Sequence, residues 1–322
     1  MKSIERFCKS FFLNSRVLWH YGKLNPQRVQ LINSNHHVYV DPHDPRGRKK
    51  IIFDCMRERF SRNQQFWRKA ISVISPDTVL DIGLNYGECL FSTELMSHTR
   101  GFGFDANPEL RPWVAKSLAE HPSRDQMEVL FQLVSDGEIG EEDFFINKKW
   151  SGGSTAGLAS DDYDRTCYEK VTVPKSSVDH VLRSRDVAGG TVVFKIDVEG
   201  YELRVLTGMR ETLADSRGFL GYIEFDNHLL RRAHKDVTSC WDSLRNQFAV
   251  YAFTRSNKWR QTNDFSIDQL ANFCGKQSHA DRTKHFHTDL LLTHPDTTVL
   301  AEEVLEIWEQ DFSQLEVSRR AA

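Results

Sequence analysis

From about residue 78 onward, the chain alternates short apolar segments with helical patterns, and this alternation constrains the fold more than any other feature. Strands that alternate with helices form a mainly parallel sheet covered by helices on both faces. The sequence therefore predicts an α/β fold. The predicted strands are residues 78–82, 101–105, 127–134, 192–198, 219–225, 248–253 and 289–293. The predicted helices are residues 87–97, 108–120, 176–185, 201–214, 237–247 and 266–273.

The same alternation divides the chain into three expected parts. Residues 1–75 are predicted to form an N-terminal appendage, residues 76–299 the α/β domain, and residues 300–322 an acidic, solvent-exposed C-terminal helix. Within the domain, we expect residues 143–146 and 170–173 to pair as a hairpin around a long polar loop.

The appendage is expected to contain an amphipathic helix at its start, a short strand at 37–40 and a helix at 60–74. The first helix carries apolar residues at helical spacing, but charged residues interrupt them too often for a signal peptide. Packing on its own protein or in a homodimer is our expectation for this helix, and lying on a membrane surface is the alternative. Its apolar residues are Ile4, Phe7, Cys8, Phe11 and Phe12, and its basic residues are Lys2, Arg6, Lys9 and Arg16.

Composition narrows the class of protein. The 42 basic and 45 acidic residues argue against a general polyanion binder, and we expect no nucleic-acid partner because no basic stripe is evident. No apolar run reaches the roughly 20 residues that a membrane-spanning helix needs. Six widely spaced cysteines without a CxxC pair indicate reduced thiols in a cytoplasmic protein.

The first predicted strand runs into the glycine turn of VLDIGLNYGECL, residues 79–90. Gly83 and Gly87 form a GxxxG pattern, which lacks the second glycine with which GxGxxG lets the backbone approach a pyrophosphate. Asp81 precedes the turn, where its carboxylate would repel a pyrophosphate and attract a cation. The cationic S-adenosylmethionine therefore suits this turn better than NAD. An NAD-dependent oxidoreductase and a non-catalytic cofactor-binding interaction protein remain the alternatives.

Two further segments are predicted to contact this cofactor. Asp105 ends the second strand, 24 residues after Asp81, where an acid can accept hydrogen bonds from ribose hydroxyls. The alternative is that Asp105 caps the helix starting at Pro108. After the third strand, Ser135 and Asp136 are candidates for the adenine edge, although Asp-Gly is equally typical of a plain turn.

A third strand end carries two acids in FKIDVEGYELRVLTGM, residues 194–209. Asp197 and Glu199 follow a buried strand and precede a helix, which places them at the carboxyl edge of the sheet, where ligands bind in open α/β folds. Lys195 shares their strand parity and is a candidate partner for a carboxylate. The structural alternative is that Glu199 only caps the following helix.

The order VLDIGLNYG, FDANP, LVSDG, SSVDHVL, VVFKIDVEGYELRVLTGM and YIEF over residues 77–228 resembles the FkbM-type family of S-adenosylmethionine-dependent O-methyltransferases. The resemblance implies a Rossmann-like, seven-stranded class I methyltransferase sheet. It also implies an acceptor hydroxyl on a small molecule, sugar, glycan or polyketide-like compound, and a role for Asp197 and Glu199 at the active edge. The implied cofactor-binding residues are Asp81, Gly83, Asn85, Gly87, Asp105 and Ala106. Leu84 and Tyr86 are bulkier than the family pattern, and Asp105 is shorter than the usual glutamate.

Methylation of an alcohol needs a group that removes its proton. The candidates are Asp197, Glu199 and His228, the last of which follows the fifth predicted strand in YIEFDNHLL. We expect no metal. The alternative is Mg²⁺ held by Asp197, Asp226 and Asn227, since oxygen ligands at one sheet edge suit this ion.

Overall fold

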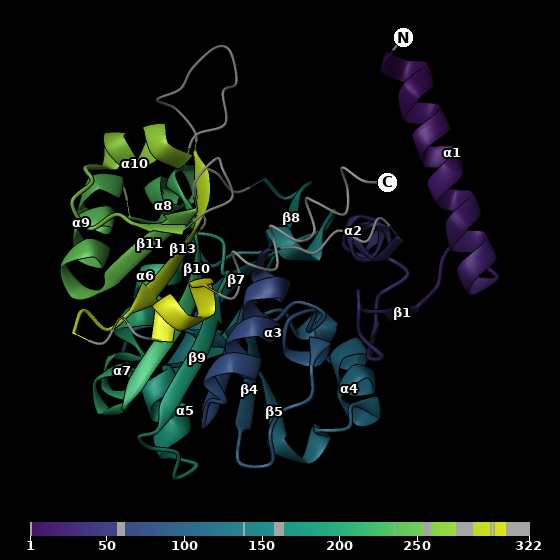
Figure 1. Ribbon diagram of the computed structural model, residues 1–322. Helices are drawn as coiled ribbons and strands as arrows, with labels where there is room; N and C mark the ends of the chain where they lie inside the picture. Colours follow the sequence, from purple (N-terminus) through teal and green to yellow (C-terminus); the bar gives the residue numbers. More distant parts are fainter. Residues whose placement is uncertain are drawn as a thin grey trace.

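The computed structural model describes residues 2–56, 62–137, 139–157, 164–234, 236–253, 259–274, 286–296, 298 and 300–306. Its centre is a sheet with the strand order β12-β11-β13-β10-β9-β3-β4-β5 (Figure 1). The strands from β5 to β10 are parallel, and β13 runs antiparallel to both β10 and β11. The expected seven-stranded sheet is therefore confirmed, with β12 added at the edge. The strands are β3 (Thr78–Ile82), β4 (Arg100–Asp105), β5 (Met127–Phe131), β9 (Thr191–Ile196), β10 (Gly218–Asp226), β11 (Ala249–Phe253), β12 (Trp259–Gln261) and β13 (His287–Thr293).

Alternate residues of each central strand enter hydrophobic cores on opposite faces of the sheet. In β3, Val79 joins the core covered by α3 and α4, whereas Leu80 and Ile82 join the core covered by α5, α6, α9 and α10. This period of two is the geometric consequence of an extended backbone buried on both faces. The helices are α3 (Arg62–Ile74), α4 (Arg111–Glu120), α5 (Val178–Arg183), α6 (Glu202–Thr207), α7 (Arg210–Asp215), α8 (Asn227–His234), α9 (Val237–Gln247) and α10 (Ile267–Cys274).

The predicted helix at 87–97 is wrong. Only the short 3₁₀ helix η1 (Leu90–Ser92) forms there. Asn85 and Gly87 have φ angles of 52° and 86°, which an α-helix does not accommodate. In addition, the Leu90 N–H donates to the buried Asp81 side chain at 3.0 Å, so Asp81 takes the place of a helical acceptor.

The predicted strand at 127–134 is divided between two sheets. β5 ends at Phe131, and Leu133–Val134 forms β6 in a separate three-stranded sheet of order β6-β8-β7. In that sheet, β7 (Gly140–Asn147) pairs with β8 (Tyr168–Ser176), and Phe144 lies opposite Val171. The predicted hairpin is therefore confirmed and is longer than expected.

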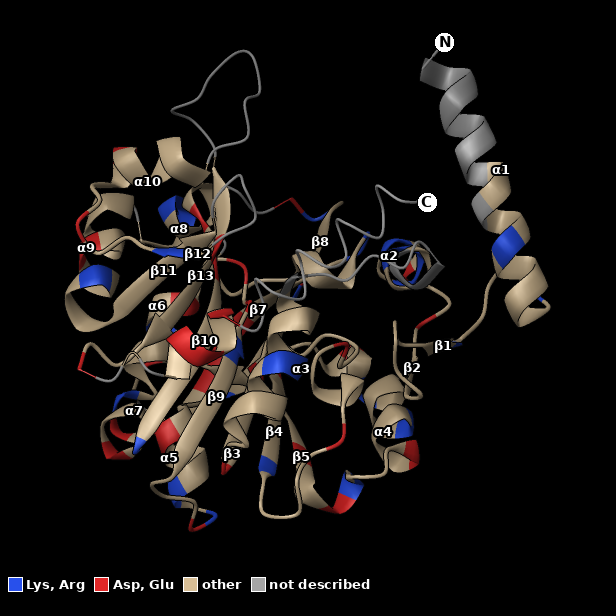
Figure 2. Ribbon diagram, in the orientation of Figure 1, with Lys and Arg blue, Asp and Glu red and all other residues tan. Residues whose placement is uncertain are grey.

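The N-terminal appendage shares the core on one face of the main sheet. Val17, Val29, Ile51 and Trp67 from the appendage belong to the same buried cluster as Val79. Its first helix stands away from the sheet and lies beside α2 (Figure 1), and Lys and Arg residues gather in α2 (Figure 2). The remaining elements are α1 (Lys2–Tyr21), β1 (Arg28–Gln30), β2 (His37–Tyr39) and α2 (Pro45–Met56).

The C-terminal helix is described at 300–306, and the rest of its predicted length lies outside the described residues. Ala301 and Val304 are buried in the core of the appendage face, so this part packs on the domain rather than lying in solvent. Among the helices that the structure describes, none combines the length and apolarity needed to cross a bilayer.

Candidate active site

The carboxyl ends of the central parallel strands border one cavity, at the edge where open α/β sheets bind ligands. Appended segments complete its wall: β1–β2 loop residues, α2, α3 and the turn around Trp150. The cavity is therefore shared between the sheet domain and its appendage. Residues that line it include Lys50, Asn63, Gln64, Gly83, Asn85, Glu88, Asp105, Ala106, Leu133, Val134, Phe144, Trp150, Ser151, Lys195, Asp197, Glu199 and Glu224.

The glycine turn is held in a fixed shape at the end of β3. Gly83 has a φ of 79°, and a Cβ there would lie 1.8 Å from the Asp197 carbonyl oxygen, so only glycine fits. Asn85 donates its N–H to Asp105 Oδ2 at 2.7 Å, and its Oδ1 accepts from Ser151 Oγ at 2.9 Å. The turn is thus tied both to the end of β4 and to the loop that follows β7. Gly87, which lies outside the cavity wall, packs against Phe91.

Asp105 lies at the predicted strand end, and its carboxylate borders the cavity beside Ala106. Its second oxygen, Oδ1, accepts from the Asn107 N–H at 2.8 Å. The cap of the following 3₁₀ helix, η2 (Pro108–Leu110), is the Asn107 side chain, which accepts from the Glu109 N–H. Burial raises the pKa of Asp105 to about 6. Each of its oxygens has one backbone donor and keeps acceptor capacity for a ligand hydroxyl.

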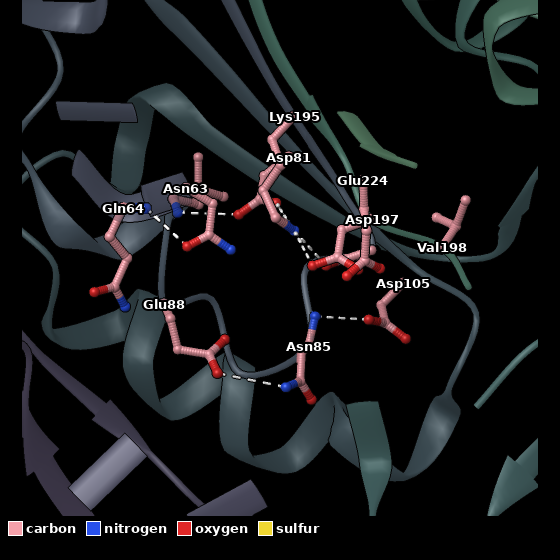
Figure 3. Close-up of polar contacts among 12 residues, drawn as sticks. Asn63, Gln64, Asp81, Asn85, Glu88, Asp105, Lys195, Asp197, Val198 and Glu224 are labelled. Atoms are coloured by element: carbon pink, nitrogen blue, oxygen red, sulfur yellow. Dashed lines mark hydrogen bonds and ion pairs between the residues drawn. The ribbon is translucent and has the colours of Figure 1, made fainter. Parts of the chain in front are cut away.

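Asp81 is buried beneath the turn and lies outside the cavity wall. Its Oδ1 lies 3.3 Å from Lys195 Nζ (Figure 3), and the Lys195 ammonium also donates to the Gly83 carbonyl at 3.0 Å. Burial alone would lower the pKa of Lys195, but Asp81 and Asp197 raise it, so the ammonium stays charged. The cation that the sequence predicts at Asp81 is therefore supplied by the chain itself, and Asp81 acts on the site through Lys195.

Three carboxylates gather at the ends of β9 and β10. Asp197, Glu199 and Glu224 each place an oxygen within 4.8 Å of the others, and Figure 3 shows Asp197 and Glu224 side by side. Burial would raise the pKa of Asp197, but Lys195, whose Nζ lies 3.6 Å from Oδ2, and Lys50 hold it below its usual value. Burial and the negative charge of Asp197 raise the pKa of Glu224 to about 7. One proton is therefore shared within this pair near neutral pH.

Glu224 is also linked to solvent through the antiparallel strand β13. His287 Nε2 lies 2.6 Å from Glu224 Oε1, and the His287 side chain is 46% exposed. The hydrogen bond to Glu224 raises the pKa of His287 to about 9. The His287 imidazolium therefore donates to Glu224 at neutral pH and favours the ionised form of that carboxyl.

Glu199 does not cap the following helix. The N-cap of α6 is Tyr201, which makes no side-chain cap bond, and Glu202 accepts the N–H groups of Val198 and Gly200 instead. Burial, Glu224 and Asp197 raise the pKa of Glu199 to about 9, so it is protonated at neutral pH. A protonated carboxyl can donate a hydrogen bond to a bound ligand.

Several predicted residues are not brought to the cavity. His228 is exposed on α8. Asp226 accepts the His228 and Leu229 N–H groups as the start of α8, and Asn227 Oδ1 accepts from the Phe286 N–H at 2.9 Å. The alternative magnesium trio of Asp197, Asp226 and Asn227 is therefore not assembled.

After β5, the residues that line the cavity lie two positions before the pair that the sequence predicted. Ser135 Oγ donates to Asp136 Oδ1 at 2.8 Å, and Asp136 lies 3.7 Å from Arg204. Leu133 and Val134, rather than this pair, line the cavity.

Other wall residues were not predicted as site residues. Glu224 lies at a predicted strand end, so the sequence did indicate its place at this edge. Its contact with His287 depends on the antiparallel strand β13, which lies next to β10. Lys50, Gln64 and Trp150 come from the appendage and the loop after β7, and no motif in the sequence marks them.

Solved structures with a similar chain course include O-methyltransferases. TomG from Streptomyces achromogenes, in complex with SAM, is 14% identical over 80% of this chain and 92% of that chain, with a TM-score of 0.38. An O-methyltransferase from Bacillus cereus in complex with SAH is 10% identical over 72% and 81%, with a TM-score of 0.36. A SAM-dependent O-methyltransferase from Thermotoga maritima is 11% identical over 76% and 69%, with a TM-score of 0.35.

No protein of curated function matches the chain. A family model does: the methyltransferase FkbM domain matches residues 81–282, which is more than half of the chain. The matched region begins at Asp81 and contains Gly83, Asp105, Asp197 and Glu224. The resemblance seen in the sequence is thereby confirmed: the chain belongs to the FkbM methyltransferase family.

Proposed function

We propose that the protein is an S-adenosylmethionine-dependent O-methyltransferase that acts on a hydroxyl of a small molecule, sugar, glycan or polyketide-like acceptor. The observation that carries the proposal is one cavity lined by two chemically different groups of residues. The first group is the glycine turn with Asp105, to which it is bonded, and the second is Asp197, Glu199 and Glu224. A cationic, phosphate-free cofactor fits the first group, and an alcohol that must lose a proton fits the second.

The residues of the first group fit the parts of the cofactor. Asp105 would accept hydrogen bonds from the ribose hydroxyls, and Gly83 and Asn85, which also line the cavity, would border the methionine portion. Ala106, Leu133, Val134 and Phe144 supply an apolar wall suited to adenine. Asp81 and Gly87 would act by holding the turn rather than by contact.

In the second group, we assign Glu224 as the general base. A base works best when its pKa lies near the operating pH. Asp197 is held ionised by Lys195 and is a weak base, whereas Glu199 already carries a proton at neutral pH. The pKa of Glu224, about 7, lies between the pKa values of Asp197 and Glu199. His228 is placed on the surface and is not assigned a role in this scheme.

The proposed step is an in-line displacement at the methyl carbon of the cofactor. The acceptor oxygen attacks the cofactor methyl carbon, the carbon–sulfur bond breaks, and the hydroxyl proton passes to Glu224. The products are a methyl ether and S-adenosylhomocysteine, and the proton stays on Glu224, which is 23% exposed, until it exchanges with solvent. Asp197 and Glu199 would orient the acceptor hydroxyl. We further propose a cytoplasmic location, on the basis of the cysteine pattern.

The test is transfer of an isotopically labelled methyl group from S-adenosylmethionine to panels of hydroxylated sugars, glycans, lipids and polyketides. The proposal expects a labelled ether from at least one class, and Glu224→Gln should lower kcat about 10²–10⁴-fold while cofactor affinity is kept. Label found only on nitrogen or carbon would contradict the O-methyl assignment. Full turnover by Glu224→Gln would contradict the assigned base.

A further inference from the structure

The first helix carries an apolar face that the described part of the chain leaves uncovered. Phe11 is 67% exposed, Phe12 65% and Trp19 90%, and Leu18 is about half exposed. Positions 11 and 18, and positions 12 and 19, are two helical turns apart, so these four residues share one face. Val17, which is buried in the core, lies on another face of the same helix. The contact with the body therefore does not account for the exposed aromatic residues.

Large exposed apolar patches on a folded protein mark sites of association. α1 is 20 residues long, about 30 Å at 1.5 Å per residue. It stands away from the sheet (Figure 1), although Val17 near its end is buried in the core. Its apolar face is thus accessible along a line rather than enclosed in a groove, which suits a flat surface.

The charge around this face identifies the kind of surface. Residues 1–56 contain ten Lys or Arg and four Asp or Glu, a net charge of +6, although the whole chain has a net charge of −3. Part of this charge lies in α2, which packs beside α1 and appears blue in Figure 2. Its residues Arg46, Lys49 and Lys50 are exposed. The segment that carries the apolar face is thus net positive in a chain that is net negative.

We propose that α1 and α2 dock the protein on an anionic lipid surface, with the apolar face of α1 (Phe11, Phe12, Leu18 and Trp19) inserted at the headgroup boundary. A helix with aromatic residues on one face and basic residues beside it lies in the plane of such an interface. Anionic headgroups neutralise the basic residues. Pairing of two copies through α1 would instead bring two segments of charge +6 together, so the charge favours lipid over a second copy.

The proposal does not depend on methyl transfer. It does place the cavity near the lipid surface. Lys50 of α2 lines the cavity, so one of the two docking helices forms part of its wall. Docking is tested without turnover, and its failure would leave the proposed reaction untouched.

The experiment is co-sedimentation of the full-length protein with vesicles of phosphatidylcholine containing phosphatidylserine, and with vesicles of phosphatidylcholine alone. Binding is expected only to the vesicles with phosphatidylserine, and it should weaken as salt rises because surface charges are screened. The double variant Phe12→Ser/Trp19→Ser should lose more than tenfold in bound-to-free ratio. Arg46→Glu/Lys49→Glu should lose a similar factor.

Matched controls lie elsewhere on the surface. Ile139→Ser removes an apolar side chain that is 64% exposed, and Arg124→Glu reverses a basic residue that is 58% exposed. Both should bind like the unaltered chain. Equal sedimentation with and without vesicles, or binding that survives Phe12→Ser/Trp19→Ser, would overturn the proposal. A dimer in light scattering that Phe12→Ser/Trp19→Ser converts to a monomer would also overturn it, because the face would then hold a second copy.

Discussion

Replacement of Lys195 by methionine tests the buried charge network beneath the site. The Lys195 and Asp81 side chains are only 5% and 1% exposed, and their charged atoms lie 3.3 Å apart. Removing one partner of a buried ion pair leaves the other charge uncompensated, which costs about 3–5 kcal/mol of unfolding free energy. We therefore expect Lys195→Met to lose about that much in urea denaturation followed by circular dichroism. Lys170→Met, which breaks a half-exposed pair with Asp143, should lose at most about 1 kcal/mol.

The sign of the pH dependence gives the same prediction a second test. Without Lys195, the buried Asp81 carboxyl has a folded-state pKa above its unfolded value, so ionisation opposes folding. The loss of unfolding free energy is therefore full above the folded-state pKa of Asp81. It shrinks as pH falls toward about 4, which is the ordinary pKa of an aspartate. Adding Asp81→Asn to Lys195→Met should recover most of the stability. A loss under about 1 kcal/mol, or a double variant no more stable than Lys195→Met, would refute the account of this network.

Three further predictions concern the site. Asp105→Ala should weaken S-adenosylhomocysteine binding by about 1–3 kcal/mol in calorimetry, because a charged acceptor for two hydroxyls is lost; unchanged affinity would remove Asp105 from the cofactor site. In a pH profile, kcat/KM should rise as Glu224 loses its proton near pH 7. His287→Asn should move that rise to higher pH, since the His287 hydrogen bond lowers the pKa of Glu224; an unmoved profile would detach His287 from the base. Turnover should survive exhaustive chelation, whereas loss with rescue by Mg²⁺ would assign Asp197, Glu199 and Glu224 to a cation.

The sequence predicted the sheet well because buried parallel strands have a clear signature. The run at 78–82 was placed with its exact bounds, and Asp105 and Asp197 were placed at strand ends because a strand-to-helix change marks them. The helix at 87–97 was predicted wrongly since its apolar spacing is helical, yet the positive φ angles of Asn85 and Gly87 prevent that conformation.

The carboxylate cluster could be predicted from the sequence only in part. Glu199 and Asp197 were identified, but the choice among three acids depends on distances to Lys195 and His287. The His287 contact arises from the register of β10 with β13, where Asp226 lies opposite His287. Such antiparallel pairing joins residues about sixty positions apart, and no local pattern encodes it. The appendage residues in the cavity wall, Lys50 and Gln64, could not be assigned either, because their neighbours in the cavity are distant in the sequence.

The most direct test of the central claim is a calorimetric titration of the full chain with S-adenosylhomocysteine and, separately, with NAD. We predict saturable binding of S-adenosylhomocysteine and none of NAD, because the turn at Gly83 has Leu84 and Asn85 where a pyrophosphate-binding turn has its second glycine. Gly83→Val should remove the binding, since its side chain would collide with the Asp197 carbonyl. NAD binding without S-adenosylhomocysteine binding would contradict the account.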